Sequence, residues 1–265
     1  PSNLIINLAS LGHAVRLISA TGDDADGQRI RNFLTQYNVS TDSIDAVNFP
    51  TSRVYINQSL ATPIPRFERG ADYHIDYQEA FATWVQSAHI FHFTYWPLSA
   101  NPAKNTVLKL IDVAKAHGTR VSFDPNYHPD LWTDSGLTPA ELKDLLPKID
   151  IIKPSLDDAK RLFQTDGTKE DFMNRFESHN IPLIIMTLGA DGVYVSDHKT
   201  RIHIPAHITE IIDTTGAGDA FMAGFLSRYL SHDTLPNAIA FAQTMSAHAL
   251  KTIGAIAPID SLKGV

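Results

Sequence analysis

The 265-residue chain contains no cysteine, which excludes disulfide bonds and thiolate metal sites. Basic residues are also few: 22 Lys and Arg stand against 29 Asp and Glu, so the formal net charge is -7. A nucleic-acid-binding surface is therefore not expected, because such surfaces are strongly basic. No apolar run is long enough to span a bilayer. These features fit a cytoplasmic protein that holds any anionic ligand with backbone donors and a few cations.

Several common functional motifs are missing as well. The sequence has no GxxxxGK[ST], which excludes a P-loop, and its GxGD stretch cannot continue as GxGxxG because Phe221 takes the place of the last glycine. HExxH is absent, and the pairs His89/His92 and His203/His207 come with no third ligand in sequence. Neither a Rossmann nucleotide site nor a histidine metal centre is predicted.

The stretch from Ile208 to Leu230, ITEIIDTTGAGDAFMAGFLSRYL, carries the clearest chemical signal. Its first residues, 208–212, form a short apolar run typical of a strand, and residues 213–219 turn the chain through two glycines. From Ala220 to Leu230 there is no proline and most residues are apolar, which predicts a buried helix. We therefore expect a glycine-lined junction between a strand and the N-terminus of a helix.

Such a junction binds anions, because the first N–H groups of a helix lack intrahelical partners and form the positive end of its dipole. Backbone donors of Gly216, Ala217 and Gly218 would stabilise a phosphate, and Asp219 would accept the proton of an attacking hydroxyl. These are the requirements of phosphoryl transfer to an alcohol. In the simpler interpretation, Asp219 caps the helix beside a glycine-rich turn.

Two groups of residues carry a family resemblance. Asp213–Asp219 (DTTGAGD) and Ala223–Leu226 (AGFL) match, at every position, the C-terminal signature of the PfkB (ribokinase-like) carbohydrate kinases, which this chain resembles. Asn3, Gly12 and Gly22 keep the spacing of the N-terminal signature of that family. The strand and the Gly-Gly pair that precede this Asn in the family would lie outside the chain.

The resemblance implies a ribokinase-like α/β fold, a three-layer α/β/α sandwich with a mostly parallel sheet and a small β lid. One kinase domain would span residues 1–265, with the lid at about residues 44–75 and a homodimer formed through it. From about residue 80 helices and strands also alternate, which by itself predicts right-handed βαβ crossovers. We expect strands at 15–19, 51–60, 90–93, 120–123, 149–152, 183–186 and 193–195, and helices at 3–11, 28–37, 81–87, 102–117, 139–146, 157–163 and 169–179.

The same resemblance implies a loop and a helix that bind ATP. Thr187, Gly189 and Gly192 of the stretch TLGADG would contact the nucleotide, although the pattern alone predicts a turn between two strands. Gln243 stands where the family often has an Asn near the base. A monovalent cation such as K⁺ would lie near Asp213 and residues 252–258, as in some relatives.

A second stretch, KPSLDD, aligns with the N-x-x-E segment that helps these kinases to hold phosphate and Mg²⁺. Lys153 and Ser155 would then face the nucleotide, and Asp158 would offer Mg²⁺ an oxygen ligand, usually through water. Ser155 and Asp158 replace the Asn and Glu of the family. The pattern alone predicts a Ser that caps a helix with an acidic first turn.

Four residues are implied for the sugar besides Asp219. Asn3 would contact sugar hydroxyls, and Arg69 in RGAD resembles an Arg of the lid in fructokinases and 2-keto-3-deoxygluconate kinases. Asp124 and His128 belong to FDPNYH, which resembles a segment of the same subgroup. His128 stands where that subgroup has an Arg, so it departs from the pattern that binds an acidic sugar.

We therefore predict an ATP-dependent kinase that phosphorylates a sugar hydroxyl, most similar to fructokinases, with Mg²⁺ brought by ATP. The alternatives within this class are 2-keto-3-deoxygluconate kinase and ribokinase or nucleoside kinase. A relative that binds a sugar or a nucleotide without turnover is the alternative from another class, and the residues at Ser155, Asp158 and His128 favour it. The intact GAGD favours an enzyme, since a binding protein has no need of the base.

Overall fold

The computed structural model describes residues 2–56, 65–207 and 210–259. The chain divides into two compact units, a first one formed by Pro1–Asp72 with His207–Val265 and a second one formed by Tyr73–Ala206. The single kinase domain expected over residues 1–265 stays a prediction.

A six-stranded mixed sheet forms the centre of the second unit, in the order β10-β9-β8-β7-β6-β5. Its strands are β5 (Ile90–Thr94), β6 (Arg120–Asp124), β7 (Ile151–Ile152), β8 (Leu183–Thr187), β9 (Val193–Ser196) and β10 (Arg201–Ile204). The strands β5 to β8 are parallel, as predicted, whereas β9 pairs antiparallel with β8, and β10 antiparallel with β9. The carboxyl ends of β5 to β8 therefore lie at one edge of the sheet.

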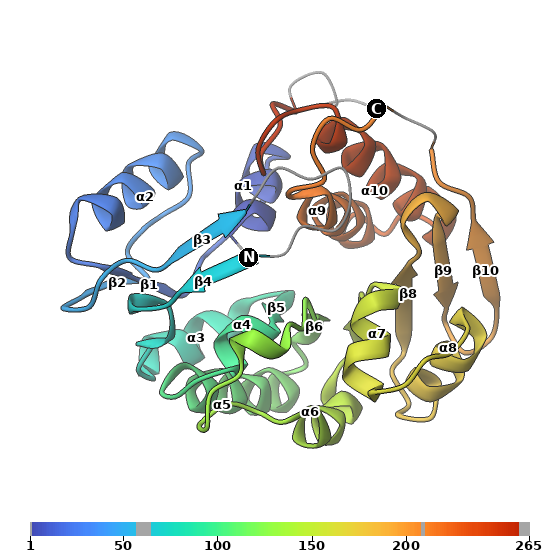
Figure 1. Ribbon diagram of the computed structural model, residues 1–265, viewed down its shortest axis with the longest axis horizontal. Helices are drawn as coiled ribbons and strands as arrows, with labels where there is room; N and C mark the ends of the chain where they lie inside the picture. The colour runs from blue at the N-terminus through green and yellow to red at the C-terminus, as the bar shows by residue number, and fades with distance from the viewer. Residues whose placement is uncertain (1, 57–64, 208–209, 260–265) are drawn as a thin grey trace. The chain divides into compact units, whose positions relative to one another are not determined.

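The helices of the second unit are α3 (Glu79–Ser87), α4 (Tyr95–Leu98), α5 (Ala103–His117), α6 (Pro139–Leu145), α7 (Leu156–Phe163) and α8 (Lys169–Glu177). Val107, Leu110, Ile111 and Ala114 give α5 a buried face at helical spacing, and Figure 1 shows this helix beside β5 and β6. A left-handed Gly118 ends α5 (φ 78°), and capping boxes begin α6, α7 and α8. Local sequence therefore determines where these helices start and stop.

The first unit contains α1 (Ser2–Ser10), α2 (Ala25–Gln36), α9 (Ala217–Leu230) and α10 (Leu235–Leu250), with the strands β1 (Ser19–Gly22), β2 (Ile44–Val47), β3 (Arg53–Ile56) and β4 (Pro65–Glu68). Helix α9 packs along α10 and against α1 (Figure 1). β1 and β2 pair in parallel, and β3 and β4 form an antiparallel pair with Arg53 opposite Glu68. This pair falls in the range expected for the lid, and residues 57–64 lie outside the described residues.

Two predicted strands are displaced or absent, and the strand expected at 149–152 is confirmed only over Ile151–Ile152. The strand expected at 15–19 runs instead over Ser19–Gly22, where it pairs with β2 from Ile44 onward. Leu17, which precedes the strand, is buried in an apolar cluster. The strand expected at 208–212 is wrong for residues 210–212, which form no strand, and residues 208–209 lie outside the described chain. The N–H of Ile212 donates to the carbonyl of Leu250 (2.8 Å), so the end of α10 takes the bond that a neighbouring strand would take.

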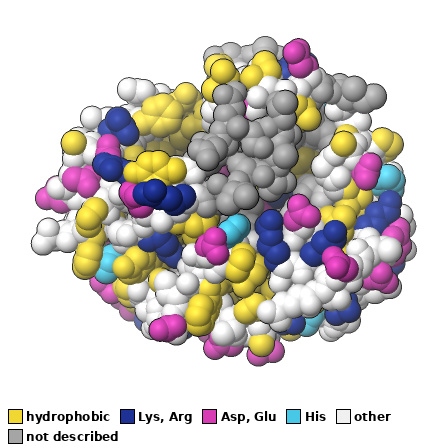
Figure 2. All heavy atoms as spheres, viewed as in Figure 1, with side chains coloured by type: hydrophobic (Ala, Val, Ile, Leu, Met, Phe, Trp, Pro, Cys, Tyr) yellow, Lys and Arg dark blue, Asp and Glu magenta, His cyan; other side chains and the backbone are white. Residues whose placement is uncertain are grey.

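Among the described residues, no helix is long and apolar enough to cross a membrane. On the face drawn in Figure 2, basic and acidic side chains of the described residues are interspersed rather than gathered by sign. This mixed surface agrees with the negative net charge in offering no strongly basic face on that side.

The start of α2 is tied to the segment that leads into β3. The carboxylate of Asp24 caps α2 by accepting from the N–H of Gly27 (2.8 Å), and it also accepts from the hydroxyl (2.6 Å) and the N–H (2.8 Å) of Thr51. The hydrogen bonds from Thr51, and then the one from Gly27, lower the pKa of Asp24 from 3.8 to about 2. The ionised carboxylate therefore holds the base of the β3–β4 hairpin.

This lowered pKa predicts a loss of stability in acid. Because the carboxylate ionises more readily in the folded chain than in the unfolded one, its contribution is complete above about pH 4 and falls as the pH drops toward 2. The difference in free energy of unfolding between the wild type and Asp24→Asn should shrink over this range, as measured by urea unfolding at several pH values. Asp23→Asn, at the neighbouring exposed Asp, is the control. A difference that does not depend on pH would contradict the prediction.

Candidate active site

The glycine-rich turn of the first unit sits at the start of α9. The helix begins at Ala217, three residues before the predicted start at Ala220, so Gly218 and Asp219 lie in its first turn. Gly216 is the N-cap residue with φ 80°, and a Cβ atom built on it would lie 2.2 Å from the carbonyl oxygen of Ala255. A glycine is therefore required here both by the left-handed backbone and by the close approach of a second segment.

The structure brings Asn3 to Asp219. The side-chain amide of Asn3, in the first turn of α1, donates to Oδ2 of Asp219 (2.9 Å), and both side chains are partly buried. A carboxylate offers about four lone-pair positions, so this one bond leaves capacity for the proton of a hydroxyl. The arrangement is an oriented carboxylate in the first turn of α9.

Asp213, expected near a cation, is held by backbone donors. Its two carboxylate oxygens accept from the N–H groups of Thr215 and Gly254, both at 2.9 Å. These hydrogen bonds lower the pKa of Asp213, and the bond from Gly254 has the largest effect. Among the described residues there is no group of three or more His, Asp or Glu that could hold a metal ion. The K⁺ site stays a prediction.

Gln243 lies on α10, the helix that was expected to border the base. The helix is confirmed over Leu235–Leu250, and the Gln243 side chain is buried within the first unit. Its contact with a nucleotide stays a prediction.

At the carboxyl edge of the sheet in the second unit, two predicted site residues pair with each other. The ammonium of Lys153 lies 2.9 Å from Oδ2 of Asp124, and the side chains are only 4% and 1% exposed. Asp124 ends β6 and Lys153 follows β7, so neighbouring parallel strands place them at the same edge. Since a buried charge is costly without a partner, Lys153 neutralises Asp124, a role that the sequence did not indicate.

Ser155 and Asp158 form the capping box of α7, as the pattern alone predicted. Oδ2 of Asp158 accepts from the N–H (3.0 Å) and the hydroxyl (2.7 Å) of Ser155, while Oδ1 accepts from the N–H of Tyr127 (3.0 Å). Three donors thus occupy the carboxylate, which is 5% exposed at the level of the residue. This geometry does not favour Asp158 as a metal ligand, and the metal role stays a prediction.

The loop from Thr187 to Gly192 connects β8 to β9, so the predicted turn between strands is confirmed. Gly189 is the first residue of a short 3-10 turn. Gly192 has φ 93°, and a Cβ atom built on it would lie 2.1 Å from the carbonyl oxygen of Ile204. A cavity of about 520 Å³ adjoins the loop, lined among others by Leu156, Thr168, Lys169, Leu188, Asp191 and His203. Its size lies within the range of small-ligand pockets.

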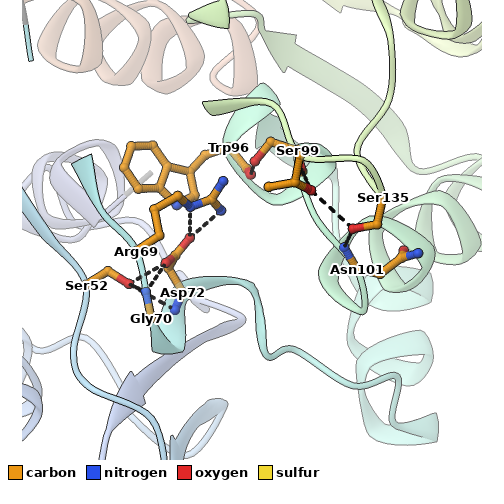
Figure 3. Close-up of polar contacts among 9 residues, drawn as sticks. Ser52, Arg69, Gly70, Asp72, Trp96, Ser99, Asn101 and Ser135 are labelled. Carbon is orange, nitrogen blue, oxygen red and sulfur yellow. Dashed lines mark hydrogen bonds and ion pairs between the residues drawn. The ribbon is translucent and has the colours of Figure 1, made fainter. Parts of the chain in front are cut away.

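The two remaining predicted sugar residues are also engaged. Arg69 donates through Nε to Asp72 (3.0 Å), and Asp72 in turn accepts from Ser52 and from the N–H of Gly70, as Figure 3 shows. Asp72 was not predicted, although its i,i+3 spacing from Arg69 was a signal for an ion pair. His128 caps a 3-10 turn by accepting through Nδ1 from the N–H of Asp130 (3.3 Å).

Comparison with known proteins identifies the family and the fold of the chain. Residues 1–262 match the pfkB family carbohydrate kinase. The ATP-dependent 6-phosphofructokinase of Thermoanaerobacterium thermosaccharolyticum is 37% identical, over 100% of this chain and 83% of its own length. A solved fructokinase of Halothermothrix orenii is 32% identical with a TM-score of 0.83, over 95% of this chain and 87% of that chain.

A second solved structure, the fructokinase of Vibrio cholerae O395 in its fructose-, ADP- and calcium-bound form, is 25% identical with a TM-score of 0.85. The similarity covers 97% of this chain and 85% of that chain. These likenesses confirm the expected ribokinase-like α/β fold, and the family match spans nearly the whole chain. The chain belongs to the pfkB family of carbohydrate kinases.

Proposed function

We propose that the protein transfers the γ-phosphoryl group of MgATP to a hydroxyl of a fructose-type sugar, with Asp219 as general base. The observation that carries the proposal is the hydrogen bond from Asn3 to Asp219 in the first turn of α9. This bond orients a carboxylate at a helix N-terminus, where a phosphate is also favoured. Membership of the pfkB family supports the reaction class.

In the proposed reaction the sugar oxygen attacks the γ-phosphorus, and its proton passes to the Asp219 carboxylate. The bond from that phosphorus to the bridging oxygen breaks, and ADP leaves with the electron pair. The N–H groups of Gly216, Ala217 and Gly218 stabilise the negative charge that gathers on the transferred group. Mg²⁺ enters as part of the nucleotide substrate and reduces the charge of its phosphates.

For the nucleotide we propose the loop of Thr187, Gly189 and Gly192 with the adjoining cavity of about 520 Å³. The close approach at Gly192 and the turn at Gly189 give this loop a defined shape. Ser155, at the start of α7, and Gln243, on α10, are retained as nucleotide contacts from the resemblance alone.

For the sugar we propose Asn3, Arg69, Asp124 and His128. Two of these residues are held in ion pairs, Arg69 with Asp72 and Asp124 with Lys153. Each would therefore meet the sugar as part of a neutralised pair rather than as a single charge. Lys153, predicted at the nucleotide, acts in this proposal by neutralising Asp124.

A second acceptor is favoured by one specific observation. The relative that is 37% identical is named an ATP-dependent 6-phosphofructokinase, whereas the solved structures at 32% and 25% are named fructokinases. Fructose 6-phosphate is therefore the second candidate acceptor for the same reaction.

Both acceptors can be compared by release of ADP from MgATP, with 2-keto-3-deoxygluconate, ribose and nucleosides in the same panel. We expect turnover to rise at least about tenfold above the background without acceptor for fructose or fructose 6-phosphate. A clear preference for one of the two identifies the substrate. ATP and sugar binding without turnover would instead support the non-catalytic interpretation and contradict the proposed reaction.

We further propose that residues 1–265 form one kinase domain and that the protein is cytoplasmic. We also propose that two copies form a homodimer through the hairpin of β3 and β4. Val54 of β3 is 42% exposed, which leaves an apolar side chain on one face of this hairpin for a second copy. Light scattering on the purified protein tests the dimer, and a monomer at micromolar concentration would contradict it.

A further inference from the structure

The carboxylate of Asp158 does more than cap its own helix. The capping boxes of α6 and α8 use Glu141 and Asp171, which are exposed and accept from the cap residues Thr138 and Thr168. Asp158 is buried, and its second carboxylate oxygen accepts from a backbone N–H that lies outside α7, 31 positions away in the sequence. The capping box uses only Oδ2 of Asp158, so Oδ1 is available to bind a segment outside the helix.

The N–H that Asp158 binds belongs to Tyr127, in the turn that follows β6. Helix α7 holds this residue on both sides, since Arg161 also donates to its carbonyl oxygen (3.3 Å). Tyr127 is 6% exposed as a residue, and its ring packs edge to face on Tyr95 with centroids 4.7 Å apart. The preceding Asn126 is exposed and has a left-handed backbone (φ 40°). The bonds of α7 therefore secure a turn whose middle residue reaches the surface in an uncommon conformation.

The position of this turn gives the bond a consequence for the ligand. In open α/β sheets, ligands bind outside the carboxyl ends of parallel strands, and Asp124–Tyr127 leaves such an end. Helix α7 starts after the neighbouring strand β7 at the same edge, and its residue Leu156 lines the cavity beside the loop of residues 187–192. Asp158 thus joins the segment at one parallel strand end to the helix at the next.

We infer that Asp158 is a positioning residue, which holds the Asp124–Tyr127 turn in the shape that receives the sugar, and that it is not a ligand of Mg²⁺. The inference rests on the proposed sugar kinase activity. Loss of the carboxylate frees the Tyr127 peptide, so the turn becomes mobile and sugar binding weakens. The turn does not hold the nucleotide in the proposal, and the bonds that Ser155 loses to Asp158 affect nucleotide binding less than the freed turn affects sugar binding.

The test compares Asp158→Ala with Glu141→Ala, which removes a capping box of the same kind from the exposed start of α6. Amide hydrogen exchange of the peptide that contains Tyr127 should quicken at least about tenfold in Asp158→Ala and stay unchanged in Glu141→Ala. The KM for the sugar should rise about tenfold, more than the KM for MgATP, which changes only through the bonds that Ser155 loses, while the Mg²⁺ concentration for half-maximal rate changes less than about threefold. If Asp158→Ala does not fold, Asp158→Asn keeps the shape and loses one acceptor oxygen.

Unchanged exchange at Tyr127 would overturn the inference. So would a raised Mg²⁺ requirement with an unchanged KM for the sugar, since that is the behaviour of a metal ligand. If the wild type phosphorylates no sugar, the proposed function fails, but the exchange measurement still decides whether Asp158 holds the turn. The two failures are therefore distinguishable.

Discussion

Asp219→Asn is expected to lower kcat for the sugar by about 10²–10⁴-fold and to leave the fold intact. Asparagine has nearly the same shape as aspartate, and its side-chain oxygen can still accept from the Asn3 amide. It cannot take up the proton of the attacking hydroxyl, so the loss falls on the chemical step. The measurement is steady-state kinetics with saturating MgATP, with thermal unfolding of both proteins as the check of the fold.

The matched control is Asp233→Asn. Asp233 also lies at the start of a helix, where it accepts from the N–H of Thr234 (2.7 Å) and the amide of Asn237 (2.9 Å), and it is partly exposed and outside the proposed site. This variant should keep kcat within about twofold, because Asp233 takes no part in the proposed reaction. A kcat that falls equally in both variants, or in neither, would count against Asp219 as the base.

Gly216→Ala is expected to have the largest effect on stability. The left-handed backbone costs an alanine about 1–2 kcal/mol, and its Cβ atom would lie 2.2 Å from the carbonyl oxygen of Ala255, a contact that forces the backbone to move. Overpacking of this kind costs about 1–3 kcal/mol more. The free energy of unfolding, measured with urea, should therefore fall by about 2–5 kcal/mol. Turnover should fall too, because the displaced turn carries Asp219.

Gly118→Ala separates the two causes. Gly118 ends α5 with a nearly equal φ of 78°, yet a Cβ atom there would meet nothing within 4 Å. Its substitution should cost the backbone term alone, about 1–2 kcal/mol, and should leave kcat unchanged. An equal loss of stability in the two variants would show that the contact with Ala255 has no energetic weight.

The sequence predicted well those features that depend on short stretches of chain. The glycine-rich turn followed by an apolar helix was expected because helix starts and their anion-binding chemistry are local, and α9 begins within three residues of the predicted position. The parallel strands β5 to β8 followed from the alternation of helices and strands. The strand expected at 208–212 failed because apolar β-branched residues favour a strand only where a partner strand is present, and residues 210–212 meet the end of α10 instead.

The sequence by itself therefore determined the family, the glycine-rich helix start and the residue types of the candidate site. Tertiary structure alone decided which of those residues meet. Asn3 contacts Asp219 across 216 positions because α1 packs on α9, and Lys153 neutralises Asp124 because two parallel strands end side by side. Composition and periodicity do not predict such pairs, because a hydrogen bond or an ion pair between distant segments depends on the packing that brings their backbones together.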